Sequence, residues 1–223
     1  MIKVYINGLS GKMGNTLSAL INSNSSNDKF ILSDKIIDSN VVIDFSNPKS
    51  SMEVIEKCKK NSKPIIIGTT GFVKEEIQLI NKISKNIAIL LLSNMSQGIT
   101  NLKISISSFL KNNNEKIKCI IKEIHHKDKI DSPSGTAIDL KKFILDCDTK
   151  NMIYFEKIIS ERIEDFYGIH EVVFKNEINE FVFKHEALSR DSFAMGSLNS
   201  ASKILDLKPG LYKYDDYLHI NNF

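Results

Sequence analysis

The first 96 residues alternate short apolar runs with helical patterns, and this alternation restricts the fold more than any other feature of the chain. The last of these apolar runs, residues 87–92, is apolar at every position, as expected of a strand covered on both faces. The strand-like runs lie at 2–6, 30–34, 41–46, 64–67 and 87–92. The helical patterns between them lie at 15–21, 51–60 and 74–85. Repeated strand–helix units predict a parallel, doubly wound sheet.

The pattern changes after Gly98. A helical pattern at 99–111 and a β-branched run at 117–122 come first. Three more strand-like runs follow, at 152–159, 169–175 and 180–187, and the last of them alternates with the period of two that is typical of a strand. A helix followed by several strands predicts an α+β domain with a mixed sheet. We therefore expect domains at 1–96 and 97–192, followed by a segment at 193–223 that opens with a helix.

The composition is ordinary for a globular protein, with 42% hydrophobic and 26% charged residues among 223. The 30 lysine and arginine residues are spread along the chain and give a net charge of only +3, so nucleic-acid binding is not indicated. Cys58, Cys119 and Cys147 form no C-x-x-C pair, which favours a reducing compartment. Because no signal peptide or membrane-spanning run is evident either, we expect a cytoplasmic protein without membrane contact.

Three glycines, Gly8, Gly11 and Gly14, follow the first strand-like run in a G-x-x-G-x-x-G spacing. Between a strand and a helix, small residues let a diphosphate approach the helix N-terminus. A Rossmann-like domain also carries a carboxylate about 20 positions further on, where Asp34 stands, followed here by Lys35. The spacing predicts a dinucleotide site, although a plain tight turn explains the glycines alone equally well.

Residues 123–137 read EIHHKDKIDSPSGTA and are predicted to form a strand-to-helix loop. His125, His126 and Lys129 place proton-transfer groups beside a fixed cation. The segment 133–136 then opens a helix, whose free N–H groups favour an anion such as a carboxylate. A solvated polar loop is the alternative. A metal site is not indicated, because adjacent histidines lack the i,i+4 spacing and no cysteine or third histidine lies nearby in the sequence.

This segment resembles the signature of the dihydrodipicolinate reductase family, E-x-H-H-x-x-K-x-D-x-P-S-G-T-A, at every fixed position. The resemblance spans almost the whole chain. Further family patterns are G-x-x-G-x-M-G at 8–14, D-F-[ST]-x-P at 44–48, N-[FM]-S-x-G at 94–98, G-x-H at 168–170 and H-x-A-x-[ST]-R at 185–190. The chain departs from the family in a much shorter stretch after Lys35 and in Ser160, which stands where G-E-R usually begins.

The resemblance implies NADH- or NADPH-dependent reduction of 4-hydroxy-tetrahydrodipicolinate, or its dehydrated form, to tetrahydrodipicolinate in lysine and diaminopimelate biosynthesis. It implies His125 and Lys129 as the acid–base pair and His126 as a substrate contact. Gly135 and Thr136 are implied to bind one carboxylate of this small dicarboxylate substrate. No metal is implied.

The resemblance also assigns dinucleotide binding to 1–96, and substrate binding and oligomerisation, commonly as a homotetramer, to 97–192. The segment 193–223, with its tail at 212–220, is implied to return to the first domain. The implied cofactor-binding residues are Gly8, Gly11, Lys12, Met13, Gly14, Asp34, Lys35, Gly68, Thr69, Thr70, Ser93, Asn94 and Met95. Because Asp34 favours NADH and Lys35 favours NADPH, we expect both cofactors to work.

Alternative functions remain open from the sequence. The nearest is a related nicotinamide-dependent reductase of another small imine or keto acid. A non-catalytic dinucleotide-binding regulator would not need His125 and Lys129 together, and a hydrolase would need a nucleophile-elbow pattern that Ser134 lacks. We interpret Asp131 as a turn residue rather than a partner of Lys129. His170 and His185 are interpreted as structural residues, as single strand histidines usually are.

Overall fold

The computed structural model describes residues 1–23, 29–164 and 166–213. Backbone contacts divide the chain into two compact units. The first unit comprises Met1–Met95 together with the chain from Phe193 onward, and the second comprises Ser96–Ser192. None of the described helices is both long and apolar enough to span a membrane.

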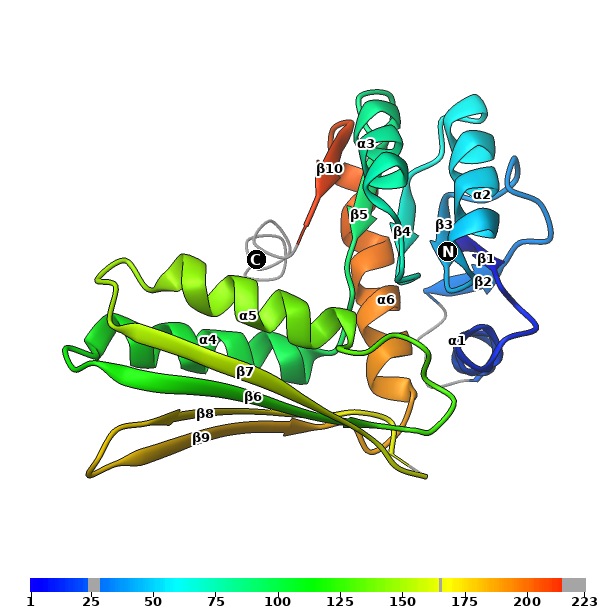
Figure 1. Ribbon diagram of the computed structural model, residues 1–223. Helices are drawn as coiled ribbons and strands as arrows, with labels where there is room; N and C mark the ends of the chain where they lie inside the picture. Colours follow the sequence, from blue (N-terminus) through cyan, green and yellow to red (C-terminus); the bar gives the residue numbers. More distant parts are fainter. Residues whose placement is uncertain (24–28, 165, 214–223) are drawn as a thin grey trace. The chain divides into compact units, whose positions relative to one another are not determined.

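The first unit contains a sheet whose described strands all run parallel, in the order β10-β5-β4-β3-β1-β2 (Figure 1). The strand β1 has β2 on one side and β3 on the other, so the order in which successive strands are added to the sheet reverses at β1. Open α/β sheets bind ligands outside the carboxyl ends of their strands at such a point. The strands are β1 (Ile2–Asn7), β2 (Phe30–Leu32), β3 (Val41–Asp44), β4 (Ile65–Ile67), β5 (Ala88–Leu91) and β10 (Gly210–Tyr212).

Helices cover both faces of this sheet, because its buried strands are apolar on both sides. One core joins Val4 and Ile6 of β1 to Leu17 and Ala194, and the other joins Val42 to the remaining helices. The doubly wound parallel sheet predicted from the strand–helix alternation is confirmed. The first core holds α1 (Lys12–Asn22) and α6 (Asp191–Lys203), and the second holds α2 (Pro48–Lys60) and α3 (Lys74–Ile83).

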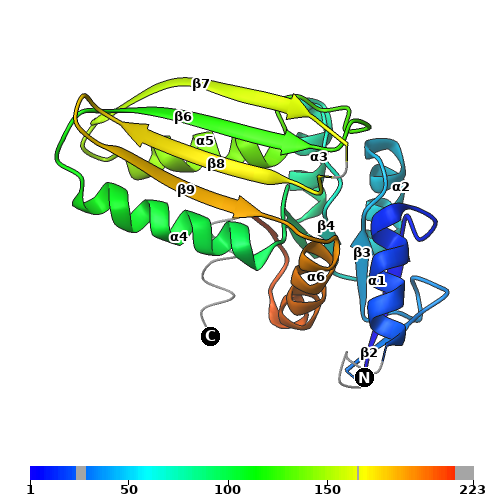
Figure 2. The same ribbon diagram turned by 90° about the horizontal axis from the view of Figure 1, so that it is seen from below.

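The second unit is a mixed sheet of order β7-β6-β8-β9, as the alternation after Gly98 predicted. The central strand β6 pairs in parallel with β7 and antiparallel with β8, and β9 pairs antiparallel with β8. Both helices of the unit lie on one face of the sheet, as Figure 2 shows. The elements are α4 (Gln97–Asn112), β6 (Ile117–His125), α5 (Gly135–Cys147), β7 (Ile153–Arg162), β8 (Ile169–Lys175) and β9 (Glu180–Glu186).

The strand β6 corrects the prediction that a loop begins at residue 123. It continues to His125, because Glu123 pairs with Ser160 on one side and His170 on the other. Neighbouring strands thus satisfy the backbone groups of a segment whose local sequence is polar. Side chains alternate along a strand, so Glu123 and His125 share the buried, helix-covered face with Ile121.

Smaller corrections concern element ends in the first unit. The helix α1 begins at Lys12 rather than at residue 15, because Gly11 is its N-cap. The helix α2 begins at Pro48, where Asn47 caps it by accepting from the Ser50 amide. The short strand β10 was not predicted, because its three residues are too few to show the alternation of a strand. Most of the predicted tail, 214–220, lies outside the described residues.

Candidate active site

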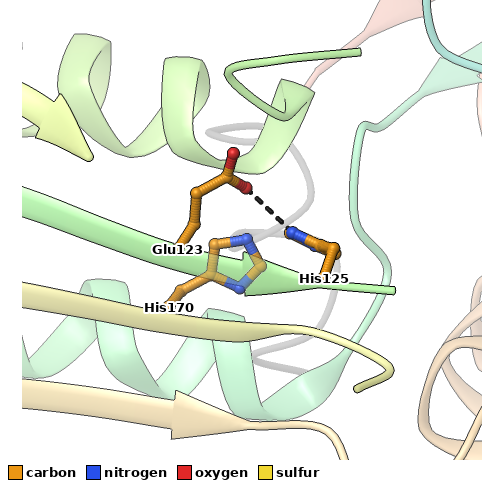
Figure 3. A group of neighbouring side chains, drawn as sticks. All are labelled: Glu123, His125 and His170. Carbon is orange, nitrogen blue, oxygen red and sulfur yellow. Dashed lines mark ion pairs between the residues drawn. The ribbon is translucent and has the colours of Figure 1, made fainter. Parts of the chain in front are cut away.

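The end of β6 carries a buried carboxylate–imidazole pair. His125 Nδ1 lies 2.9 Å from Glu123 Oε2, and Figure 3 shows the two side chains converging. The ring approaches off the N–H axis, since the contact has hydrogen-bond length without hydrogen-bond alignment. The Glu123 side chain is fully buried and that of His125 is 9% exposed, so the contact is shielded from water. Such an imidazole is suited to proton transfer.

Glu123 is also held through its second oxygen. Oε1 accepts from Arg162 Nη2 at 3.1 Å and from the Ser134 amide at 3.0 Å. Burial alone would raise the pKa of this carboxyl, but the contacts from His125 and Ser134 outweigh burial and hold the pKa well below its usual range. Glu123 is therefore an anion at neutral pH. Arg162 Nη2 also donates to the Asp131 carbonyl at 2.6 Å, which ties β7 to the loop after β6.

His170, from β8, completes the group in Figure 3. It is the cross-strand partner of Glu123, and its ring lies 5.0 Å from that of His125 in an edge-on contact. Burial, assisted by the charge of His125, lowers the pKa of His170 to about 3, so the ring is neutral. The sequence predicted a structural role for His170 and did not indicate that its ring lies against that of His125. The G-x-H pattern was the only sequence feature that pointed to this residue.

These three side chains offer ligand atoms within 4.8 Å of one another, a closeness that the sequence did not indicate. The missing third histidine is His170, which lies 45 positions after His125 in the chain. Arg162 already occupies one oxygen of Glu123, however, and a guanidinium beside a carboxylate opposes a second cation. The arrangement is better described as a buried ion-pair cluster around Glu123 than as a metal centre.

Lys129 lies in the loop after β6 and faces Asp131. Its Nζ is 2.7 Å from Asp131 Oδ1, while Asp131 Oδ2 accepts from the Gly135 amide at 3.3 Å. Burial opposes ionisation, yet the bond from Lys129 lowers the pKa of Asp131. The interpretation of Asp131 as a turn residue alone is therefore wrong, because its carboxylate contacts both Lys129 and the start of α5.

The N-terminus of α5 lies at the same end of β6. Ser134 is its N-cap and accepts from the Ala137 amide at 3.2 Å, while Thr136 is buried in the first turn. His126 begins the loop and is half-buried, and its carbonyl accepts from the Lys129 amide at 3.1 Å. Glu123, through the Ser134 amide, thus fixes this helix end beside the strand that carries His125.

The glycine turn of the first unit fits a diphosphate. Gly8 has φ +86°, and a Cβ there would lie 2.4 Å from the Phe45 carbonyl oxygen. A Cβ on Gly14 would lie 2.2 Å from the Gly8 carbonyl oxygen, so α1 can start this close to β1 only with glycine. The N-cap of α1, Gly11, has no side chain that could accept from the first amides of the helix, and the first turn holds no acidic residue. The N-terminal amides of α1 therefore suit an anion.

Asp44, at the end of β3, organises the loops around this turn. Its fully buried carboxylate accepts from Asn7 Nδ2 at 2.7 Å, from the Ser46 hydroxyl at 2.6 Å, from Thr69 Oγ1 at 3.0 Å and from the Ser51 hydroxyl. The sequence indicated Asp44 only through the D-F-[ST]-x-P pattern. Because the Thr69 hydroxyl donates to Asp44, the Thr69 side chain points into the protein and holds the 68–71 loop in place.

The other predicted cofactor residues lie at strand ends of the same sheet. Asp34 and Lys35 follow β2 and are exposed, since β2 ends at Leu32 rather than at residue 34. Gly68 and Thr70 follow β4, and a Cβ on Gly68 would lie 2.2 Å from the Phe45 ring. The half-buried Ser93 and Asn94 follow β5. The Met95 side chain is 1% exposed and belongs to the core, so only its backbone can face a ligand.

Comparison with known proteins places this geometry in a family. The model for the C-terminal part of dihydrodipicolinate reductase matches residues 97–218, and the model for its N-terminal part matches residues 24–95. The chain belongs to the dihydrodipicolinate reductase family. The resemblance found at residues 123–137 is thereby confirmed. The glycine turn precedes the matched range, so its assignment depends on spacing and on the geometry above.

Curated relatives extend over the same length. The 4-hydroxy-tetrahydrodipicolinate reductase of Bdellovibrio bacteriovorus is 32% identical over 225 residues, which cover 97% of this chain and 96% of the relative. That of Buchnera aphidicola subsp. Cinara cedri is 38% identical, covering 82% and 73%. Among solved structures, dipicolinate-bound dihydrodipicolinate reductase from Paenisporosarcina sp. TG-14 shares the fold with a TM-score of 0.72 at 21% identity, covering 97% and 99%.

Proposed function

We propose that the protein is a 4-hydroxy-tetrahydrodipicolinate reductase of lysine and diaminopimelate biosynthesis that uses NADH or NADPH. The observation that carries the proposal is the buried Glu123–His125 pair at the end of β6, at the helix N-terminus that follows the Lys129 loop. Family membership and the names of the curated relatives support the substrate. The test is oxidation of NADH or NADPH by the purified protein with freshly prepared substrate. No substrate-dependent oxidation of either cofactor would refute the proposal.

A nicotinamide cofactor held by the first unit would supply a hydride, with its electron pair, for a ring carbon of the substrate. The chain must then supply one proton. His125 is placed to transfer it, and Lys129 offsets negative charge that develops on the ring. The His125 ring lies 5.0 Å from that of His170, and the charge of Lys129 contributes to the lowered pKa of His170.

The first unit supplies the cofactor site. The N-terminal amides of α1 and the turn at Gly8 hold the diphosphate, and the loops ordered by Asp44 hold the nicotinamide nucleotide. Lys12, Met13, Ser93, Asn94 and the 68–70 loop complete the proposed site. A reductase of another small imine or keto acid would need the same groups, so the substrate assay decides between the two.

The cofactor preference is proposed to depend on Asp34 and Lys35. A carboxylate that accepts from both ribose hydroxyls repels a 2′-phosphate, whereas a lysine pairs with it. We expect kcat/KM values for NADH and NADPH within about tenfold of each other, about 1.4 kcal/mol. Asp34→Ala should shift the ratio toward NADPH and Lys35→Ala toward NADH. If steady-state kinetics give an unchanged ratio for both variants, these side chains stay in solvent.

The substrate carboxylate is proposed to bind at the N-terminus of α5. The Gly135 amide now donates to Asp131 at a long 3.3 Å, which leaves room for a better acceptor. We expect Thr136→Val to raise substrate KM by about 10- to 100-fold with little change in kcat, because a hydrogen bond to a charged group is worth about 1.5–3 kcal/mol. Thr149→Val, beyond the end of α5, is the matched control. An unchanged KM in folded Thr136→Val would exclude the hydroxyl from the carboxylate site.

Self-association is proposed through the sheet face of the second unit that the helices leave uncovered. This face carries charge pairs such as Lys122 with Glu171 at 3.0 Å and Lys118 with Glu156 at 3.1 Å, together with the exposed Tyr154. A tetramer is the expected state. Sedimentation equilibrium of the purified chain measures it directly, and a monomer at micromolar concentration would contradict the proposal.

A further inference from the structure

The geometry points to Glu123 as the positioning residue that sets the tautomer and orientation of the His125 ring, with Arg162 holding Glu123 in place. The inference rests on the proposed function, because it gives His125 a defined part in proton delivery. It assigns roles to Glu123 and Arg162, residues that were not among the predicted site residues.

The two oxygens of Glu123 have separate tasks. Oε1 accepts from Arg162 and from the Ser134 amide, which anchors the carboxylate to β7 and to α5. Oε2 remains for His125 Nδ1, 2.9 Å away. A carboxylate at this distance favours the proton on Nδ1, as partners of catalytic and metal-bound histidines generally do. Glu123 and His125 are two residues apart on β6, so their side chains lie on the same face of the strand and can make this contact.

The opposite edge of the ring faces Gly168. A Cβ added to Gly168 would lie 3.1 Å from His125 Nε2, and Gly168 has φ +154°. A side chain here would therefore crowd the nitrogen that Glu123 does not contact. Nε2 is the ring atom left to exchange a proton, and the glycine of the G-x-H pattern preserves the space beside it.

The other charged and titratable groups around His125 do not replace Glu123. His170, from β8, is neutral, and Arg162, from β7, is a cation that serves Glu123. In the loop, the Asp131 carboxylate is engaged with Lys129 and with the Gly135 amide. Among the described residues, Glu123 is thus the carboxylate in contact with the His125 ring.

This arrangement accounts for the proton. In the doubly protonated ring, Glu123 balances the charge at Nδ1, and the Nε2–H bond breaks as the proton moves to the substrate. The electron pair of that bond stays on Nε2, which leaves a neutral ring with its proton on Nδ1, the tautomer that Glu123 favours. Solvent restores the Nε2 proton before the next turnover.

The first test measures the tautomer of the His125 ring in the absence of substrate. In ¹⁵N-histidine-labelled full-length protein, at a pH where the ring is neutral, NMR should show His125 protonated on Nδ1. His125→Gln assigns the signals. Glu123→Gln, which can turn an amide N–H toward Nδ1, should shift the population to the Nε2–H form. An Nε2–H form in the wild type, or an unchanged tautomer in Glu123→Gln, would overturn the inference whether or not the protein is a reductase.

The second test is kinetic. An orienting carboxylate is worth about 10⁴ in kcat in serine proteases, and we expect Glu123→Gln to lose about 10²–10³ here, since the contact is less well aligned. Substrate KM and NADH Kd should stay within about threefold. Glu123→Asp, which restores the charge, should recover part of the loss. A normal kcat in Glu123→Gln would overturn the inference.

Glu115→Gln is the matched control, because Glu115 precedes β6 in the same unit and accepts from Asn176 Nδ2 at 2.7 Å, at the end of the strand away from His125. Its kcat should stay normal, and an equal loss in this variant would overturn the inference by showing a general effect on the sheet. If the wild type has no reductase activity, the proposed function fails, while the tautomer measurement still decides the role of Glu123.

Discussion

Lys129→Ala and His125→Ala should each lower kcat by about 10²–10⁴-fold, the range expected for loss of a positioned acid or base. The reason is that both groups act on the substrate side of the hydride, one by moving a proton and the other by offsetting charge. The Kd for NADH should change little, because the proposed cofactor residues belong to the first unit. Stopped-flow turnover and fluorescence titration with NADH measure the two quantities separately.

Lys127→Ala is the control for Lys129→Ala. Lys127 belongs to the same loop, but its side chain is 64% exposed and pairs with the equally exposed Glu164. This variant should keep normal kcat. If Lys129→Ala or His125→Ala also keeps near-normal kcat, the role proposed for that residue is wrong.

Asp44→Ala should lower the free energy of unfolding by about 3–5 kcal/mol, because each buried polar group left without a partner costs about 1–3 kcal/mol. The groups that lose their acceptor include the Ser51 hydroxyl of α2 and the Thr69 hydroxyl of the loop after β4. Asn7 Nδ2 keeps the Ser46 and Ser50 hydroxyls as acceptors. Asp44→Asn should cost less, since its amide oxygen still accepts. Equilibrium urea unfolding followed by circular dichroism gives the values.

The same variant should weaken NADH binding, because Asp44 joins the end of β1 to the loops after β3 and β4. Asp38→Ala is the control, since Asp38 is an exposed acidic residue of the same unit and should change the free energy of unfolding by less than about 0.5 kcal/mol. A loss below about 1 kcal/mol in Asp44→Ala would show that the donors find other partners. The loops would then not depend on this carboxylate.

Periodicity and spacing determined much of this protein. Apolar runs separated by helical patterns specified a parallel sheet, because a strand buried on both faces needs helices on both sides. The alternation of Phe181 and Phe183 with Val182 and Lys184 predicted a strand, and a helix followed by several such runs predicted a mixed sheet. The string at 123–137 specified the family, and with it the expectation of an acid–base pair at His125 and Lys129.

Tertiary pairing decided what surrounds those residues. The sequence ended β6 at residue 122, whereas pairing with β7 and β8 carries the strand to His125 and turns Glu123 to the same buried face. Arg162 and His170 reach this point from strands that are distant in the sequence. Local patterns report burial and propensity but not pairing partners, so only the folded chain could show that Glu123 contacts His125 and that Asp44 joins the loops of the first unit.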